Sequence, residues 1–141
     1  MSDDRLSRPA RPFVFPVRVY WEDTDAGGVV FYANYLKFFE RARTEWLRAL
    51  GHSQERMRRE AGVMFVVVHT EVKYLAPARL DDLLHVTVQV REAGKAALVI
   101  AQEAWRDGTL LAQGDIKIGC VDASTFRPRR IPAGILQETT T

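Results

Sequence analysis

The chain has 141 residues, 47% of them hydrophobic and 27% charged, so it can bury one core without disulfides or a structural metal. The 20 basic and 18 acidic residues give a formal net charge of +2, which argues against a dedicated nucleic-acid binder with its one-sided basic surface. The single cysteine, Cys120, cannot form an internal disulfide, and neither a signal peptide nor a membrane-spanning run is visible. A cytoplasmic location is therefore expected.

The N-terminal part of the chain changes character at about residue 13. Residues 1–12 are rich in Arg and Pro and are expected to form a flexible arm. From Val17 to Trp21, β-rich residues alternate, which predicts a strand with one face on a core. Residues 22–28, Glu-Asp-Thr-Asp-Ala-Gly-Gly, follow this strand and have the composition of a turn.

The strongest periodic signal predicts one long amphipathic helix of about five turns. Its apolar stripe is Phe31, Tyr35, Phe38, Phe39, Ala42, Trp46 and Leu50. Gly51 follows the stripe directly, as is typical of a helix end. A second, shorter helix is predicted from Ser53 to about Ala61, with Ser53 as the N-cap and Gly62 as the terminating residue.

The second half of the chain predicts strands alone, over residues 63–75, 84–90, 96–106 and 109–121. Asp107-Gly108 between the last two is a strong hairpin signal. Short connections favour antiparallel pairing, and the stripe of the long helix must be buried against the resulting sheet. The expected fold class is α+β, with one antiparallel sheet wrapped around one long helix. A single domain is expected over residues 13–133, followed by a polar tail over residues 134–141.

The turn after the first strand contains the residues best suited to chemistry. Asp23 and Asp25 lie two positions apart, and Gly27 and Gly28 lead toward the start of the long helix. Glycines let backbone N–H groups approach a ligand, and a helix start supplies unpaired donors and partial positive charge. A carbonyl bound there would be polarised, and a neighbouring carboxylate could attack it or activate water. The spacing fits equally well a turn that caps the helix, with Asp25 only accepting backbone hydrogen bonds.

A different hypothesis for the same residues is a magnesium site. A strand followed by Asp-x-Asp also begins the haloacid-dehalogenase phosphatases, and Asp81-Asp82 could supply further acidic ligands. That fold requires repeated strand–helix alternation around a parallel sheet, whereas the second half of this chain is strand after strand. The three histidines have no spacing typical of a metal site, so no metal is expected.

Longer segments of the chain resemble a known family. Residues 17–35, VRVYWEDTDAGGVVFYANY, resemble the signature of the 4-hydroxybenzoyl-CoA thioesterase family, and within it the YbgC-type, Tol-Pal-associated acyl-CoA thioesterases. Residues 39–45 (FERARTE), 74–82 (YLAPARLDD) and 120–122 (CVD) extend the likeness over nearly the whole chain outside its ends. The resemblance implies a hotdog fold, a five-stranded antiparallel sheet wrapped around one long helix. It also implies hydrolysis of an acyl-CoA thioester to a free acid and CoA, without a cofactor.

The resemblance also implies roles for individual residues. It assigns the catalytic carboxylate to Asp25, as nucleophile or general base, and the carbonyl-polarising backbone N–H groups to the region of Tyr32. Many YbgC-type enzymes have histidine at the position of Tyr32, where this chain and the 4-hydroxybenzoyl-CoA branch have tyrosine. The expected substrate-binding residues are Gly28, Val29, Phe31, Asn34 and Arg79. Arg79 is the candidate for a phosphate contact, with an ion pair to Asp81 or Asp82 as the alternative.

Family members work as dimers or tetramers with active sites at the subunit interface, so a homo-oligomer is expected here. An acyl carrier protein is a second candidate partner. A non-catalytic acyl-binding scaffold of the cell-envelope machinery is the main alternative function. The intact Asp-Thr-Asp-Ala-Gly-Gly turn argues against it, because a binder has no need of a reactive carboxylate.

Overall fold

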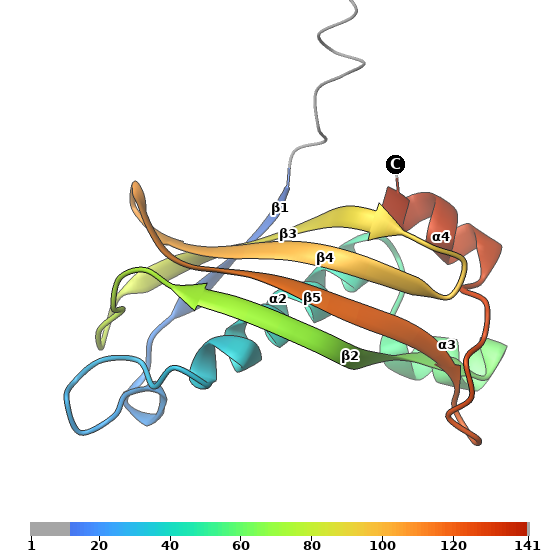
Figure 1. The fold of residues 1–141 in the computed structure, drawn as a ribbon, viewed down its shortest axis with the longest axis horizontal. Coiled ribbons are helices and arrows are strands. Elements are labelled where there is room, and N and C mark those ends of the chain that lie inside the picture. Colours follow the sequence, from blue (N-terminus) through green and yellow to red (C-terminus); the bar gives the residue numbers. More distant parts are fainter. Residues whose placement is uncertain (1–11, 141) are drawn as a thin grey trace, which may run out of the picture.

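The computed structural model describes residues 12–140 and contains one antiparallel sheet of five strands. The strands are β1 (Phe13–Arg18), β2 (Val63–Tyr74), β3 (Leu83–Ala93), β4 (Ala97–Arg106) and β5 (Thr109–Asp122). They lie in the order β1-β3-β4-β5-β2, and every neighbouring pair is antiparallel (Figure 1). The predicted five-stranded antiparallel sheet is confirmed. The arm expected over residues 1–12 lies outside the described residues except for Pro12.

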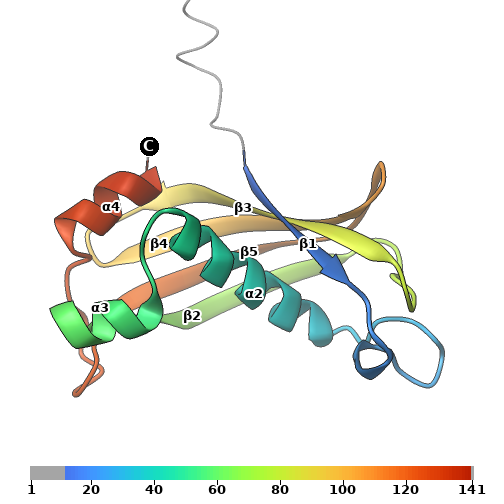
Figure 2. The ribbon, with the colours of Figure 1, turned by 180° about the vertical axis from the view of Figure 1, so that it is seen from behind.

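Helix α2 (Asn34–Ala49) lies against one face of this sheet and supplies much of the core (Figure 2). Phe38, Phe39 and Ala42 are completely buried and share one cluster with apolar side chains of β3, β4 and β5. The predicted stripe is therefore correct within the helix. It is wrong for Phe31, which precedes the helix and is half exposed. The backbone just before it forms isolated bridges, Thr24 with Val30 and Val29 with Arg79, instead of a helical turn.

The first strand begins and ends earlier than predicted. β1 pairs with β3 from Phe13 opposite Val88 to Arg18 opposite Leu83, whereas the sequence pattern indicated residues 17–21. Trp21 instead begins a single 3₁₀ turn, η1 (Trp21–Asp23). The Tyr20 N–H donates to the side chain of Asp23 rather than to a neighbouring strand, so the chain turns at this point.

The shorter helix has the predicted ends. α3 spans Gln54–Ala61, and the Ser53 hydroxyl accepts a hydrogen bond from the Arg56 N–H. Gly62 follows in the left-handed conformation, with φ of 68°, which is the usual glycine C-cap. Neither this helix nor any other in the described part of the chain is long and apolar enough to cross a membrane.

The C-terminal segment expected as a polar tail contains a third helix, α4 (Ala133–Thr140). Ile135 in this helix and Ile131 just before it are buried in the main core cluster. Residues 133–140 contain few apolar side chains, so their sequence shows no clear helical periodicity of hydrophobic residues. Packing of Ile135 and the partly buried Leu136 against the core accounts for the ordered helix.

Candidate active site at the start of helix α2

The loop between η1 and α2 lies just before the start of the helix (Figure 1), and hydrogen bonds within its own backbone close it. The Asp25 N–H donates to the Val29 carbonyl at 2.9 Å, and the Gly28 N–H donates to the Asp25 carbonyl at 3.0 Å. Gly28 has φ of 79°, a left-handed conformation in which a side chain would be strained. The second glycine of the motif is thus required by the turn that presents Asp25.

The Asp25 carboxylate is exposed and held by one of its two oxygens. Its Oδ1 accepts hydrogen bonds from the Gly27 N–H at 2.8 Å and the Val29 N–H at 3.4 Å. Its Oδ2 has no hydrogen-bond or ion-pair partner within residues 12–140. A side chain at position 27 would begin 3.3 Å from Oδ1, so glycine there leaves room for the carboxylate. The geometry gives one fixed and one available oxygen.

Asp23 has a different environment, although it lies only two residues away. It is 4% exposed, and its Oδ2 accepts the Tyr20 N–H at 2.8 Å. Its Oδ1 accepts from Nδ2 of Asn34, the first residue of α2, also at 2.8 Å. Asn34 is itself buried, and the Phe31 N–H donates to the Asp23 carbonyl. Asp23 therefore fastens the Asp25 turn to the start of the helix.

The start of α2 leaves backbone donors unpaired. Ala33 is the N-cap residue and provides no side-chain hydrogen bond to the helix. Within the described chain, the N–H groups of Tyr32 and Ala33 have no acceptor. Free N–H groups at a helix start attract negative charge, and the helix dipole adds to the attraction. The Asp25 turn thus adjoins a small set of preorganised donors.

An aromatic cluster lies beside these donors. The rings of Tyr32 and Tyr74 are 6.0 Å apart, and those of Tyr35 and Tyr74 are 5.5 Å apart. Burial raises the pKa of both Tyr35 and Tyr74, so their hydroxyls stay protonated near neutral pH. A cavity of about 300 Å³ is lined by Val30, Tyr32, Tyr35, Tyr74, Leu75, Ala76 and Pro77. Its apolar walls suit an acyl group.

Arg79 is placed next to the turn by backbone pairing. Val29 and Arg79 form an antiparallel bridge, so Arg79 adjoins the residue that contacts Asp25. Asp82 accepts the Arg79 backbone N–H and pairs with Arg106 Nη1, each at 2.8 Å. The exposed Arg79 guanidinium has no ion-pair partner among residues 12–140, so the alternative pairing with Asp81 or Asp82 is not formed.

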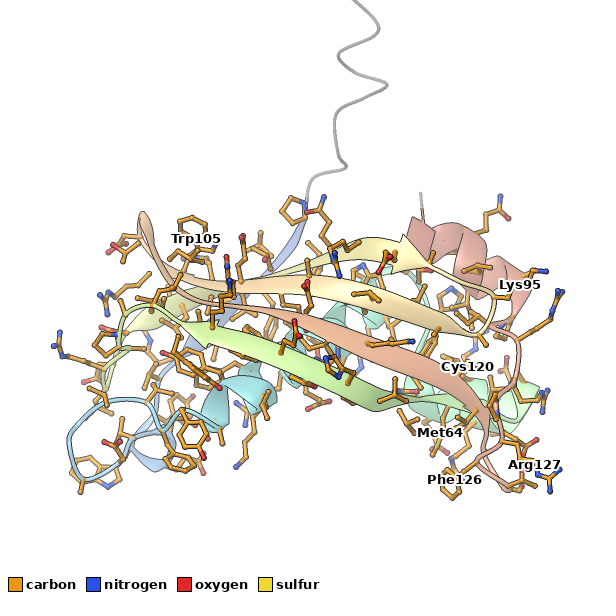
Figure 3. All side chains as sticks on the ribbon, viewed as in Figure 1. Met64, Lys95, Trp105, Cys120, Phe126 and Arg127 are labelled. Atoms are coloured by element: carbon orange, nitrogen blue, oxygen red, sulfur yellow. The ribbon has the colours of Figure 1, made fainter. Side chains whose placement is uncertain are left out.

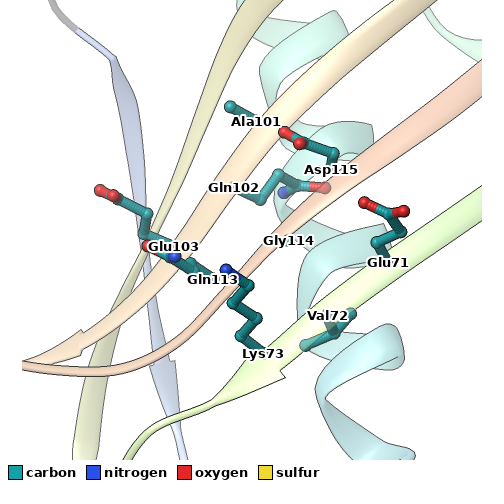
Figure 4. Close-up of a pocket in the computed structure, with 9 residues that line it drawn as sticks. All are labelled: Glu71, Val72, Lys73, Ala101, Gln102, Glu103, Gln113, Gly114 and Asp115. Carbon is teal, nitrogen blue, oxygen red and sulfur yellow. The ribbon is translucent and has the colours of Figure 1, made fainter.

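Other features of the molecule lie away from this turn. A cavity of about 500 Å³ on the sheet face opposite α2 is lined by Glu71, Lys73, Glu103 and neighbouring residues of β2, β4 and β5 (Figure 4). No group of three or more His, Cys, Asp or Glu side chains in the described chain is placed to hold a metal. Cys120 on β5 is buried, and burial raises the pKa of its thiol, so it packs as a small hydrophobic residue (Figure 3).

The structure brings most of the predicted site residues together. Hydrogen bonds join Asp25 to Gly28 and Val29, and a bridge joins Val29 to Arg79. Tyr32 directly follows Phe31, whose N–H donates to the Asp23 carbonyl. Asn34 is turned inward to Asp23, so its side chain positions the helix start. Sequence reasoning missed Tyr35 as a cavity residue, because its place in the apolar stripe marked it only as core. It also missed Tyr74, which entered only as part of a matching segment.

Comparisons with known proteins agree on one group. Residues 19–138 match the family model described as the thioesterase-like superfamily. The acyl-CoA thioesterase YbgC of Haemophilus influenzae is 46% identical over 120 residues, covering 85% of this chain and 88% of that protein. The acyl-CoA thioester hydrolase YbgC of Escherichia coli O6:H1 is 45% identical over 127 residues, covering 89% and 94%. The crystal structure of a probable thioesterase from Bartonella henselae superposes with a TM-score of 0.82 at 32% identity, covering 86% of this chain and 100% of that one.

Proposed function

This chain belongs to the thioesterase-like superfamily, and from that premise we propose that it hydrolyses acyl-CoA thioesters with the Asp25 carboxylate. The predicted YbgC-type resemblance and hotdog fold are confirmed by the relatives and by the solved thioesterase. One observation carries the proposed mechanism. A carboxylate with one backbone-bound and one unpartnered oxygen lies on a turn that Asp23 fastens to unpaired N–H groups at a helix start.

In the proposed reaction, the Tyr32 and Ala33 N–H groups bind the thioester carbonyl oxygen. They stabilise the negative charge that develops there as the carbonyl carbon becomes tetrahedral. The carbon–sulfur bond then breaks, the acyl group gains a hydroxyl from water, and the CoA thiolate takes a proton. Removing one such donor in other enzymes typically slows the reaction about 10²–10³-fold, so this contribution is large.

The Asp25 carboxylate has two candidate roles in this reaction. It acts as a general base on the attacking water, or it attacks the thioester and forms an anhydride that water then opens. Single turnover in ¹⁸O-labelled water tests for the anhydride. Label in the Asp25 carboxylate would establish an anhydride opened by water at the Asp25 carbonyl, whereas the general-base route, like opening at the acyl carbonyl, places the label only in the product acid.

The acyl group occupies the cavity lined by the three tyrosines, beside the proposed carbonyl-binding N–H groups. Arg79, unpaired and next to Val29, contacts a phosphate of the CoA nucleotide. Arg79→Met is then expected to raise KM for acyl-CoA and to leave KM for the corresponding acyl-pantetheine unchanged. Equal effects on both would remove the phosphate assignment. An acyl carrier protein is a second candidate donor of the thioester.

A second copy of the chain is proposed to pair along β2 and to complete the site. β2 is an edge strand that pairs only with β5 among the described strands, and its Val67, Val68 and Tyr74 are about half exposed. The other edge, β1, is interrupted by Pro16, which cannot donate a ladder hydrogen bond. An open apolar edge strand favours association with another strand. Because Tyr74 also lines the acyl cavity, this dimer would place the site at the interface.

The unpaired, buried Cys120 favours a cytoplasmic location.

The test is a panel of acyl-CoA substrates of increasing chain length, with release of the CoA thiol measured continuously. Turnover of at least one thioester without added metal is expected. Binding of acyl-CoA without turnover of any member would instead favour the non-catalytic scaffold.

A further inference from the structure

The second half of α2 carries a cation in an unusual setting. Arg43 is partly buried, and its Nη1 donates to Gln102 Oε1 at 2.9 Å. Gln102 on β4 is completely buried, and its Nε2 donates to the carbonyls of Phe39 at 3.1 Å and Thr87 at 3.3 Å. Because both amide hydrogens are committed, the amide oxygen must face Arg43. Gln102 thus fixes the direction of the guanidinium.

The Arg43 charge has no counter-ion in contact. Burial lowers the pKa of Arg43, and the nearby Glu40 charge only partly offsets this. The Glu40 carboxylate accepts the Thr44 hydroxyl at 2.8 Å and forms no salt bridge with Arg43. Apart from the bond to Gln102, the guanidinium has no acceptor among residues 12–140. A partly desolvated guanidinium with free N–H groups favours an anionic partner.

Arg43 borders a cavity of about 130 Å³ between α2 and β2. Its apolar walls come from Trp46, Leu47, Phe65, Val66, Val67 and Ile118, and its polar walls come from Glu40, Thr44 and Gln54. The cavity therefore combines mainly apolar walls with one oriented cation, and the Glu40 carboxylate beside it accepts the Thr44 hydroxyl. Such a lining suits the end of a hydrocarbon chain that terminates in a carboxylate, which a guanidinium binds through two parallel hydrogen bonds.

The cavity lies along the same two elements as the proposed acyl site. Leu36, Glu40, Arg43 and Leu47 follow at intervals of four, three and four residues, so they share one face of α2. Leu36 is half exposed, and along α2 it falls between Tyr35, which lines the tyrosine cavity, and Glu40, which lines the Arg43 cavity. β2 forms the opposite wall of both, with Tyr74 at one end and residues 65–67 at the other. Nine residues separate Asn34 from Arg43, which is about 14 Å along the helix axis.

We propose that the Arg43 cavity binds the terminal carboxylate of the acyl chain, and that the enzyme prefers CoA monothioesters of dicarboxylic acids. This inference rests on the proposed thioesterase function and names the substrate class of the same site. A methyl-ended chain would leave the guanidinium with Gln102 Oε1 as its one acceptor among the described residues. A carboxylate would complete its hydrogen bonds, provided that the chain is long enough to reach it.

The first test compares wild-type kcat/KM for two substrate series of matched length, straight-chain acyl-CoAs and ω-carboxyacyl-CoAs with 4 to about 14 carbons. We expect a preference for the ω-carboxy series that begins only above a threshold length. Turnover of the straight-chain series without any such preference would overturn the carboxylate site and leave the proposed function intact. No turnover of either series would refute both.

The second test uses Arg43→Met, with Arg41→Met as the matched control, because Arg41 lies on the exposed face of the same helix. Arg43→Met should lower kcat/KM for the preferred ω-carboxyacyl-CoA about 10- to 100-fold, the range expected for a charge-assisted hydrogen bond. It should leave the straight-chain substrates nearly unchanged. Arg43→Met/Gln102→Leu removes the buried amide that the single variant leaves unsatisfied, and it should show the same selective loss. The inference would be overturned if kcat/KM fell equally for the straight-chain and ω-carboxyacyl-CoAs. It would also be overturned if kcat/KM fell in neither Arg43→Met nor Arg43→Met/Gln102→Leu.

Discussion

The hydrogen bonds of Asp23 allow the structural role of this residue to be separated from the catalytic role of Asp25. The two Asp23 oxygens accept from two donors, the Tyr20 N–H and Asn34 Nδ2, each at 2.8 Å. In Asp23→Asn, the shape is kept but one oxygen becomes an NH₂ group. Whichever way the new amide turns, it places a donor against a donor in a site that is 4% exposed.

The expected magnitude follows from these contacts. One hydrogen bond to a charged acceptor is lost, typically about 1.5–3 kcal/mol, and a buried donor is left unpaired. We therefore expect the free energy of unfolding to fall by about 2–4 kcal/mol, and Tm by about 5–15 °C. Denaturant unfolding and thermal melting measure the two quantities directly.

A polarity exchange provides the control. In the double variant Asp23→Asn/Asn34→Asp, the new amide donates to the new carboxylate while its oxygen still accepts the Tyr20 N–H. Stability should therefore recover by at least half of the loss. Thioesterase activity of the double variant should be low despite this recovery, because the carboxylate now at the helix start repels the developing oxyanion. An Asp23→Asn protein with wild-type stability, or a double variant no more stable than the single one, would refute this account of Asp23.

Two further predictions concern the turn and its neighbour. Gly28→Ala should lower the free energy of unfolding by about 1–2 kcal/mol, because φ of Gly28 is 79°. Gly94→Ala is the control and should cost less, because Gly94 does not have a positive φ and an added Cβ would lie 3.4 Å from the Ala97 carbonyl oxygen. Equal losses in chemical denaturation would contradict this. Burial raises the pKa of Asp82, but hydrogen bonds from Arg79 and Arg106 outweigh it, so the folded-state pKa lies below its ordinary value. The stabilisation from this lowered pKa is present above the unfolded pKa of about 4 and is lost as the pH falls through the folded pKa. Arg106→Met should therefore make the free energy of unfolding fall less steeply as the pH is lowered. An unchanged pH dependence would count against the pairing of Arg106 with Asp82.

Sequence periodicity predicted the elements whose own residues determine them. The stripe through Phe38, Phe39 and Ala42 gave the long helix because burial on one face repeats every turn. Ser53 and Gly62 gave the ends of α3 because each supplies a local cap. The first strand and the C-terminal helix were placed wrongly or missed, because long-range contacts decide them. β1 is set by pairing with β3, and α4 by the burial of Ile135.

The candidate site was predicted only in part for a similar reason. The Asp-Thr-Asp-Ala-Gly-Gly motif is contiguous, so the sequence displays it. The sequence does not display which aspartate is buried, because that depends on Asn34, eleven residues further along the chain. The Arg43–Gln102 contact joins residues 59 apart. No local pattern predicts such a pair.

The measurement that tests the central claim most directly is thioester hydrolysis by Asp25→Asn. The amide keeps an oxygen for the Gly27 N–H, so folding and Tm should stay close to those of the wild type. Glu22→Gln, which removes an exposed carboxylate three residues away, is the matched control and should retain full activity. With the acyl-CoA that the wild type turns over fastest, we expect kcat for Asp25→Asn to fall about 10²–10⁴-fold. A folded Asp25→Asn enzyme with wild-type kcat would contradict the account.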